Sequence, residues 1–211
     1  MLHGQLGCAA FLHHVRRSGA PYCEAPGCVQ QHQLETLTHA FLECPDVAPV
    51  VDWLLATWEQ LAGPQAAVPR TAAFLLADDP AGWGAAATPG LYRMWTRLRV
   101  ATLGAIWDVR CHRHCGAVGA SFASRVVAQA TRTLVTAIQR DWLRTGASLG
   151  TTAADGAHGD VRWWDQCRIS HGRFERLWAK PAVFCSVVRS PAGPPALVIR
   201  LGRDRPVAAP P

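Results

Sequence analysis

The sequence has no long apolar run, since no stretch of its 211 residues approaches the roughly 18 uncharged apolar residues of a membrane-spanning helix. Its N-terminus lacks the order of a secretory signal, because the basic residues follow a short apolar run instead of preceding it. A glycine-rich phosphate loop, a Ser/His/Asp arrangement and a reactive-cysteine motif are also missing. We therefore expect an intracellular protein, nuclear or cytoplasmic, with no membrane partner and no catalytic residues.

One pair of adjacent carboxylates, Asp78 and Asp79 in FLLADDP, echoes the aromatic-x-Asp-Asp turn of polymerases, where two carboxylates hold the metal ions of phosphoryl transfer. However, leucine precedes Ala77, and no flanking strand pair can be read from the sequence. The pattern therefore favours a helix end or cap at Asp78 and Asp79 over a polymerase active site.

Charge is unevenly distributed along the chain. Residues 1–79 hold three arginines and eight acids, whereas residues 80–211 hold eighteen basic residues and seven acids. A basic C-terminal portion fits a polyanionic partner such as RNA or DNA, and it equally fits an ordinary solvated surface.

Apolar residues at helical spacing predict three long helices, over about 47–61, 91–110 and 121–144. The first is the clearest, and the third has a stripe formed by Phe122, Val126, Ala130, Leu134, Ile138 and Trp142. Residues 69–79 predict a shorter helix. Two β-branched runs, 182–188 and 196–201, predict a hairpin.

Four cysteine and histidine residues form the pattern Cys23-x4-Cys28-x10-His39-x4-Cys44. In a reducing compartment cysteines indicate metal binding or core packing rather than disulfides. Two short-spaced pairs can supply the four tetrahedral nitrogen and sulfur ligands that zinc prefers. The pattern therefore predicts a structural Zn²⁺ site, although separate core cysteines, or His32 in place of Cys28, are alternatives.

The segment ETLTHAFLECP (35–45) resembles the zinc-binding region that follows the polymerase in non-LTR retrotransposon reverse transcriptases. That family reads C-x2-C, a spacer, then E-T-x-x-H-x-F/L-x-x-C-P. The resemblance covers roughly residues 20–115, and it implies the same four ligands. The first pair departs from the family, because four residues separate Cys23 from Cys28 where the family has two.

Together these observations predict an α+β fold, mostly α: a small zinc knuckle (residues 23–44), amphipathic helices and a C-terminal β-hairpin. We divide the chain into a leader (1–22), the zinc-binding region with its helices (23–115), a helix packing on it (116–144), a linker (145–160), a basic Trp-containing segment with the strand pair (161–205), and a disordered tail (206–211).

The resemblance implies a nucleic-acid-associated accessory domain without the polymerase active site. Its expected partners are RNA or DNA, and the polymerase part of a longer or related protein of the mobile element. A zinc-stabilised protein-interaction module and an inactive mobile-element remnant are the alternatives. Arginines interleaved with tryptophans suit contacts to phosphates and bases. The alternative, which the sequence favours, is that Trp163, Trp164, Phe174 and Trp178 form a small core. The candidate nucleic-acid contacts are Arg93, Arg97, Arg99, Arg162, Trp163, Trp164, Arg168, Arg173 and Arg176.

A second metal site is an open alternative at the end of the second long helix. Cys111 and Cys115 are four residues apart and share a helical face, so they offer half of a zinc site. Cys167 or Cys185 would have to complete it through the fold. The competing interpretation is a helix C-terminus with basic residues near its negative dipole end.

Overall fold

A computed structural model describes residues 20–70, 88–114, 121–145, 169–179, 183–189 and 195–201, together with Cys8 and His14. The α+β class, mostly α with a C-terminal hairpin, is confirmed. The elements are α2 (Pro26–Val29), η1 (His39–Glu43), α3 (Ala48–Ala62), η2 (Pro64–Ala66), α5 (Pro89–His114), α6 (Phe122–Leu143), α8 (His171–Phe174), η4 (Glu175–Ala179), β1 (Cys185–Val188) and β2 (Ala196–Ile199).

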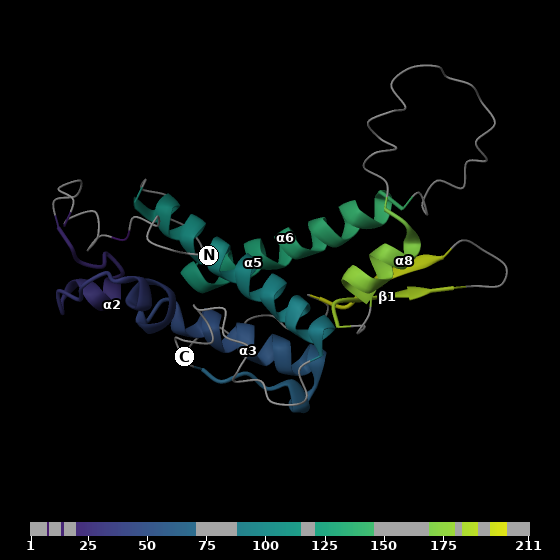
Figure 1. Ribbon diagram of the computed structural model, residues 1–211. Coiled ribbons are helices and arrows are strands. Elements are labelled where there is room, and N and C mark those ends of the chain that lie inside the picture. The colour runs from purple at the N-terminus through teal and green to yellow at the C-terminus, as the bar shows by residue number, and fades with distance from the viewer. Residues whose placement is uncertain are drawn as a thin grey trace, which may run out of the picture.

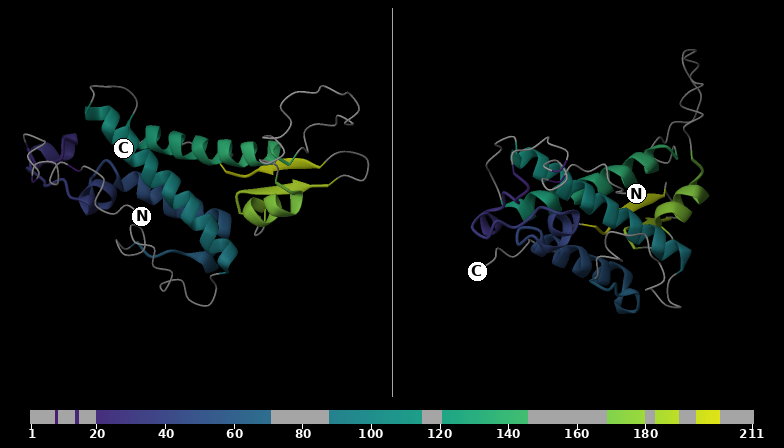
Figure 2. Two further views of the ribbon diagram at one scale, coloured as in Figure 1. Left: turned by 45° about the horizontal axis from the view of Figure 1, so that its top comes forward. Right: turned by 60° about the vertical axis from the view of Figure 1, so that its left-hand side comes forward.

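The three long helices form the body of the molecule, and α5 contacts both α3 and α6 (Figure 1). The segment with α2 lies at one end, and α8 with the hairpin lies at the other, as both further views also show (Figure 2). Helix α5 runs from the hairpin end toward the α2 end, and α6 returns in the opposite direction (Figures 1 and 2). The long α5 therefore links the two ends of the molecule.

Helix α3 begins and ends where the sequence predicts. Pro49 occupies its first turn, where a missing N–H group costs no hydrogen bond. Gly63 ends it with φ of +86°, in a region that favours glycine, and its N–H group donates to the carbonyl of Glu59 at 2.9 Å.

Helix α6 confirms the predicted stripe, because all six of its apolar members are buried. Ser121 caps the helix, since its hydroxyl accepts a hydrogen bond from the Ser124 N–H group at 3.3 Å. The periodicity was sufficient here because this helix buries only one face.

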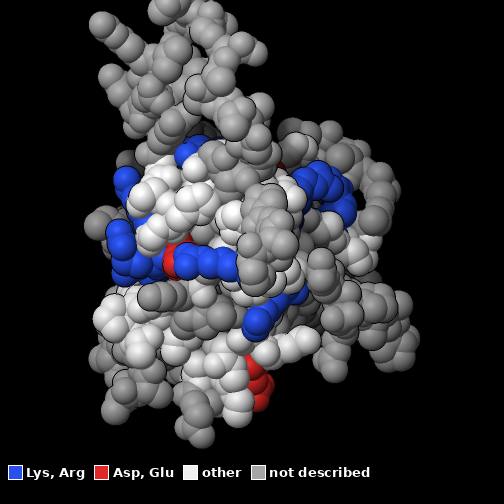
Figure 3. All heavy atoms as spheres, turned by 90° about the vertical axis from the view of Figure 1, so that its right-hand side faces the viewer, with Lys and Arg blue, Asp and Glu red and all other residues white. Residues whose placement is uncertain are grey.

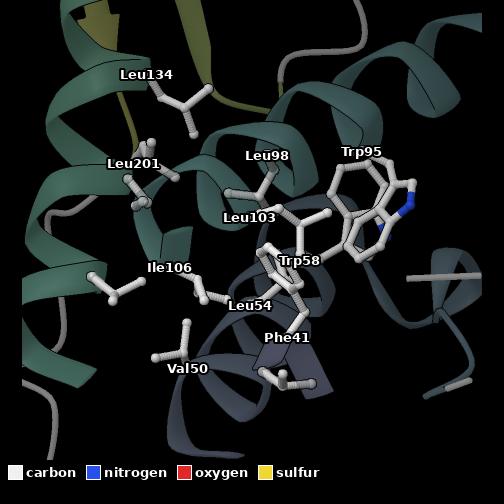
Figure 4. Close-up of a cluster of buried hydrophobic side chains, with 14 of the residues drawn as sticks. Phe41, Val50, Leu54, Trp58, Trp95, Leu98, Leu103, Ile106, Leu134 and Leu201 are labelled. Atoms are coloured by element: carbon white, nitrogen blue, oxygen red, sulfur yellow. The ribbon is translucent and has the colours of Figure 1, made fainter. Parts of the chain in front are cut away.

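The main core lies where α3, α5 and α6 meet (Figure 4). Trp58 from α3 and Trp95 from α5 pack edge to face, with ring centroids 5.5 Å apart. The buried Trp58 indole donates from Nε1 to the carbonyl of Ala66 at 2.7 Å, so its one polar group is satisfied. Leu201, just after β2, joins the same core and ties the hairpin to the helices (Figure 4).

A smaller cluster holds the C-terminal elements together. The strands β1 and β2 pair antiparallel, with Cys185 opposite Ile199. Phe174 packs on Trp142 at 5.1 Å between centroids, and the Trp178 indole donates to the Asp141 carboxylate at 2.9 Å. The core interpretation of Phe174 and Trp178 is thus confirmed, whereas the helical segment His171–Ala179 that carries them was not predicted.

Several predictions lie wholly or mostly outside the described residues: most of the leader, the short helix over 69–79 with Asp78 and Asp79, the linker after Thr145 and the tail 206–211. Among the helices that the structure describes, none is long and apolar enough to cross a membrane.

Candidate metal centre

The first ligand pair lies in a loop closed by backbone hydrogen bonds. The Cys23 N–H group donates to the Gln33 carbonyl at 2.8 Å, and the Glu35 N–H group donates to the Pro21 carbonyl at 2.9 Å. Tyr22 and Leu34 pair as an isolated antiparallel bridge between them. This short ladder fixes the base of the loop that carries Cys23 and Cys28.

The helical turn α2 accounts for the four-residue spacing within this pair. Pro26 opens the turn, and the Cys28 N–H group donates to the Ala25 carbonyl at 2.8 Å. The turn brings Cys28 back toward Cys23, whose sulfur accepts from the Ala25 N–H group at 3.5 Å. The helical turn therefore lets a four-residue spacing place both cysteines in one group.

The second pair, His39 and Cys44, spans η1, a single turn of π-helix. In an α-helix residues five apart would lie roughly 140° around the axis, on different faces. Here the Cys44 N–H group donates to the His39 carbonyl at 2.9 Å, and the wider turn places both side chains on one side. Thr36 caps this turn, because its hydroxyl accepts from the His39 N–H group at 3.0 Å.

The four predicted ligands form one buried group, in which the ligand atoms all lie within 4.8 Å of one another. The Cys44 sulfur is 3.9 Å from the sulfurs of both Cys23 and Cys28, and the Cys28 sulfur is 3.4 Å from His39 Nε2. A zinc tetrahedron has sulfur–sulfur edges of roughly 3.8 Å and sulfur–nitrogen edges of roughly 3.5 Å, given its bond lengths. The donor set therefore suits Zn²⁺, and these three distances are close to the edges of its tetrahedron.

The three thiols differ in their readiness to lose a proton. The pKa of Cys23 is lowered to about 3, chiefly because it accepts from the Cys44 thiol, with the N–H of Ala25 and the guanidinium of Arg110 contributing further. The same thiol hydrogen bond, together with burial, raises the pKa of Cys44. Burial, and then the charge of Cys23, raises the pKa of Cys28. One ligand is thus held as a thiolate, and the other two must release protons to a metal.

Helix α5 supports the centre from the side. Trp107 stacks on Phe41 of η1, with centroids 6.2 Å apart and planes 22° from parallel. The Arg110 guanidinium forms a buried ion pair with Glu35 and also donates from Nη2 to the Cys23 sulfur at 3.5 Å. Sequence reasoning missed these contacts, because 75 residues separate Glu35 from Arg110 and each pattern was interpreted locally.

The alternative ligands do not join this group. His32 is exposed, and its ring meets the edge of Tyr22 at 5.4 Å. Cys111 is exposed near the end of α5, whereas Cys185 is buried in β1 at the opposite end of the molecule (Figure 1). Burial raises the pKa of Cys185 to about 12, as expected for an unreactive core thiol. Cys115 and Cys167 lie outside the described residues.

The candidate nucleic-acid contacts fall into three groups. Arg93, Arg173 and Arg176 are exposed. Arg97 is half-buried and Arg99 is buried, so neither is exposed as a nucleic-acid contact requires. Because α5 packs against α3, α6 and η4 together, a single stripe underestimates its buried surface. The remaining four, Arg162, Trp163, Trp164 and Arg168, lie outside the described residues.

Arg97 makes its contacts within the protein. Its guanidinium lies 3.8 Å from the centroid of the Trp178 ring, and Nη1 donates to the Leu177 carbonyl at 2.8 Å. Arg99 is only 6% exposed. Arg97 therefore joins η4 to α5, and Arg99 lies in the interior. Of the described candidates, only Arg93, Arg173 and Arg176 are exposed to a partner.

Comparisons of the chain with protein-family models, with curated proteins and with solved structures found no match. The retrotransposon resemblance therefore stays a prediction, and the metal centre rests on the chemistry and geometry of its four ligands.

Proposed function

We propose that this chain is a non-catalytic, zinc-stabilised accessory domain that associates with nucleic acid. The observation that carries the zinc assignment is the single buried group formed by Cys23, Cys28, His39 and Cys44. Four protein ligands complete a zinc tetrahedron and leave no position for a substrate, which is the arrangement of structural rather than catalytic sites.

Bound zinc would crosslink the loop of α2 to the turn η1. Besides its cysteines, the knuckle contributes only Ala25, Ala40 and Phe41 to the buried core, with Leu37 and Leu42 partly buried against it. Small segments of this kind commonly depend on a metal for their fold, because the metal-binding free energy becomes folding free energy.

Charge supports a polyanionic partner. The described residues from 88 to 201 include thirteen arginines and three acids, whereas those from 20 to 70 include one arginine and six acids. Figure 3 shows arginines spread over the face that carries α8 and the hairpin, with few acidic side chains among them. Arginine contacts to phosphates would make binding depend on salt and little on sequence.

The resemblance of residues 35–45 supports a more specific assignment. We propose that the domain belongs to a retrotransposon-type reverse transcriptase. Its partner would be the polymerase region, carried by a longer form of this protein or by another protein of a related mobile element. The basis of this assignment is the order of the ligand types along the chain, with Cys23, Cys28, His39 and Cys44 in the sequence Cys, Cys, His, Cys.

The direct test is the salt dependence of binding to a mixed-sequence single-stranded RNA and to the matching DNA. We expect the logarithm of the association constant to fall linearly with the logarithm of salt concentration. Replacing Arg173 and Arg176 by glutamine should weaken binding and reduce the slope by about one for each phosphate that is no longer neutralised. Arg70→Gln is the matched control, because Arg70 is exposed on the acidic part and is ion-paired with Asp52.

A second candidate function, a protein-interaction module, is favoured by apolar side chains exposed on the knuckle. Val29 is 53% exposed, Leu34 48% and Tyr22 40%, and Tyr22 pairs with Leu34 along the backbone. Absence of RNA and DNA binding at low salt, with the helical content intact, would contradict the nucleic-acid proposal and leave this module or an inactive remnant.

A further inference from the structure

The buried ion pair between Glu35 and Arg110 requires an explanation. Their side chains are 3% and 6% exposed, and removing two charges from water costs several kcal/mol per ion before any contact is regained. Among the described residues, Arg110 Nε and Nη1 have no hydrogen-bond partner, so only Nη2 makes the polar contacts of this guanidinium. A hydrophobic pair would fill the same space at a smaller cost.

The contacts of Nη2 indicate what the pair does. This nitrogen contacts both the Glu35 carboxylate and the Cys23 sulfur, the latter at 3.5 Å. Three thiolates around Zn²⁺ carry one net negative charge, and the guanidinium brings one positive charge to the edge of that group. Hydrogen bonds from outside the ligand set orient metal ligands and tune their affinity.

The neighbouring contacts place this pair within a continuous face of α5. Trp107, Arg110 and Arg113 are spaced by three residues and lie on one side of the helix. Trp107 stacks on Phe41, and Arg113 Nη1 lies 2.6 Å from the Asp46 carboxylate. The C-terminal part of α5 therefore contacts the knuckle through an aromatic ring and one ion pair, and contacts Asp46 just after the knuckle through a second ion pair.

We propose that Arg110 is a positioning residue of the metal centre: held by Glu35, it donates to the Cys23 thiolate and offsets the negative charge of the zinc–thiolate group. Through it, metal occupancy is coupled to the C-terminal turns of α5. This inference rests on the proposed zinc site.

The test compares Arg110→Met with Arg110→Lys and with the control Arg113→Met, all in the full chain. Arg113 is the matched control because it lies one turn further along the same face, pairs with a carboxylate, and makes no described contact to a ligand sulfur. Two properties are measured: the rate of zinc transfer to a chromogenic chelator, and the thiolate-to-metal charge-transfer band of the Co²⁺-substituted protein.

We expect Arg110→Met to accelerate zinc release by about 10- to 100-fold and to shift the cobalt band. Arg110→Lys keeps the charge but not the planar fork, so its rate should lie between those of Arg110→Met and the parent. Arg113→Met should release zinc within about threefold of the parent rate and leave the cobalt band in place, because it changes packing but not the ligand sulfur.

An unchanged release rate and cobalt band in folded Arg110→Met would overturn the proposal. If Arg110→Met fails to fold, Arg110→Lys decides, and a parent-like rate and band in that variant would overturn it. A parent protein that takes up neither zinc nor cobalt would instead refute the zinc site itself, so the two failures are distinguishable.

Discussion

The knuckle and the three-helix core are stabilised by different means, although they share α5. The core buries Trp58, Trp95 and the apolar stripes of three helices, and the Trp58 indole is hydrogen-bonded to the Ala66 carbonyl. The knuckle buries three cysteines, a histidine and the Glu35–Arg110 ion pair. One region is held by packing, and the other is arranged so that a metal can complete it.

This difference shows that a short segment such as the knuckle can have a defined structure for reasons that apolar periodicity does not reveal. Burying thiolates and other charges without a compensating partner is unfavourable, whereas burying aliphatic and aromatic side chains is favourable by itself. The two regions should therefore respond differently to mutation, chelation and pH.

The largest effect is expected from Cys44→Ser. Cys44 is fully buried and its sulfur lies 3.9 Å from two other ligand sulfurs, so the variant loses a thiolate at the centre of the group. We expect zinc per chain to fall from one to near zero, with a loss of zinc-binding free energy on the order of 10 kcal/mol. Metal analysis and thermal unfolding measure this.

Cys111→Ser is the control for that substitution, because Cys111 is exposed on α5 and lies outside the ligand group. It should retain one zinc and the parent melting temperature. Retention of one zinc by Cys44→Ser would contradict the ligand assignment.

A smaller loss of free energy is expected from Trp58→Ala, which removes a buried side chain from the three-helix core instead of a metal ligand. The substitution creates a cavity and removes the Nε1 hydrogen bond to Ala66, so we expect a loss of about 3–5 kcal/mol in the free energy of unfolding. Urea denaturation at fixed zinc measures it. Trp53→Ala, at a half-buried position of the same helix, should cost clearly less, and equal costs would contradict the assigned core.

The pH dependence of zinc affinity distinguishes the regions further. The pKa values of Cys28 and Cys44 are raised, so both are protonated in the metal-free protein at neutral pH and zinc must displace two protons. Affinity should therefore fall as pH falls, by about 100-fold per pH unit. Competition with a chelator between about pH 6 and pH 8 tests this, and a pH-independent affinity would contradict the thiolate ligation.

The smallest effect is expected at the start of α6. Ser121→Ala removes the hydroxyl that caps the helix and should lower the free energy of unfolding by about 1 kcal/mol without changing zinc content. Thr133→Ala, at an exposed position inside α6, is the control and should be nearly neutral. Equal effects of the two substitutions would show that the cap contributes nothing.

The sequence predicted the three long helices and the ligand group, because both depend on local spacing. The stripe of α6 and the Gly63 end of α3 follow from periodicity and from glycine's conformational freedom. It did not predict the π-turn at His39, the Glu35–Arg110 pair or the inward position of Arg99. The last two depend on how α5 lies against α3, α6, η1 and η4, which no local pattern specifies.

Amide hydrogen exchange of the zinc-loaded chain, before and after chelation, tests the central difference between the regions most directly. We predict one zinc per chain, and on chelation a loss of protection in the knuckle and the last two turns of α5, with the buried stretches of α3 and α6 still protected. Unchanged protection in the knuckle after zinc removal, or equal loss throughout the helices, would contradict this account.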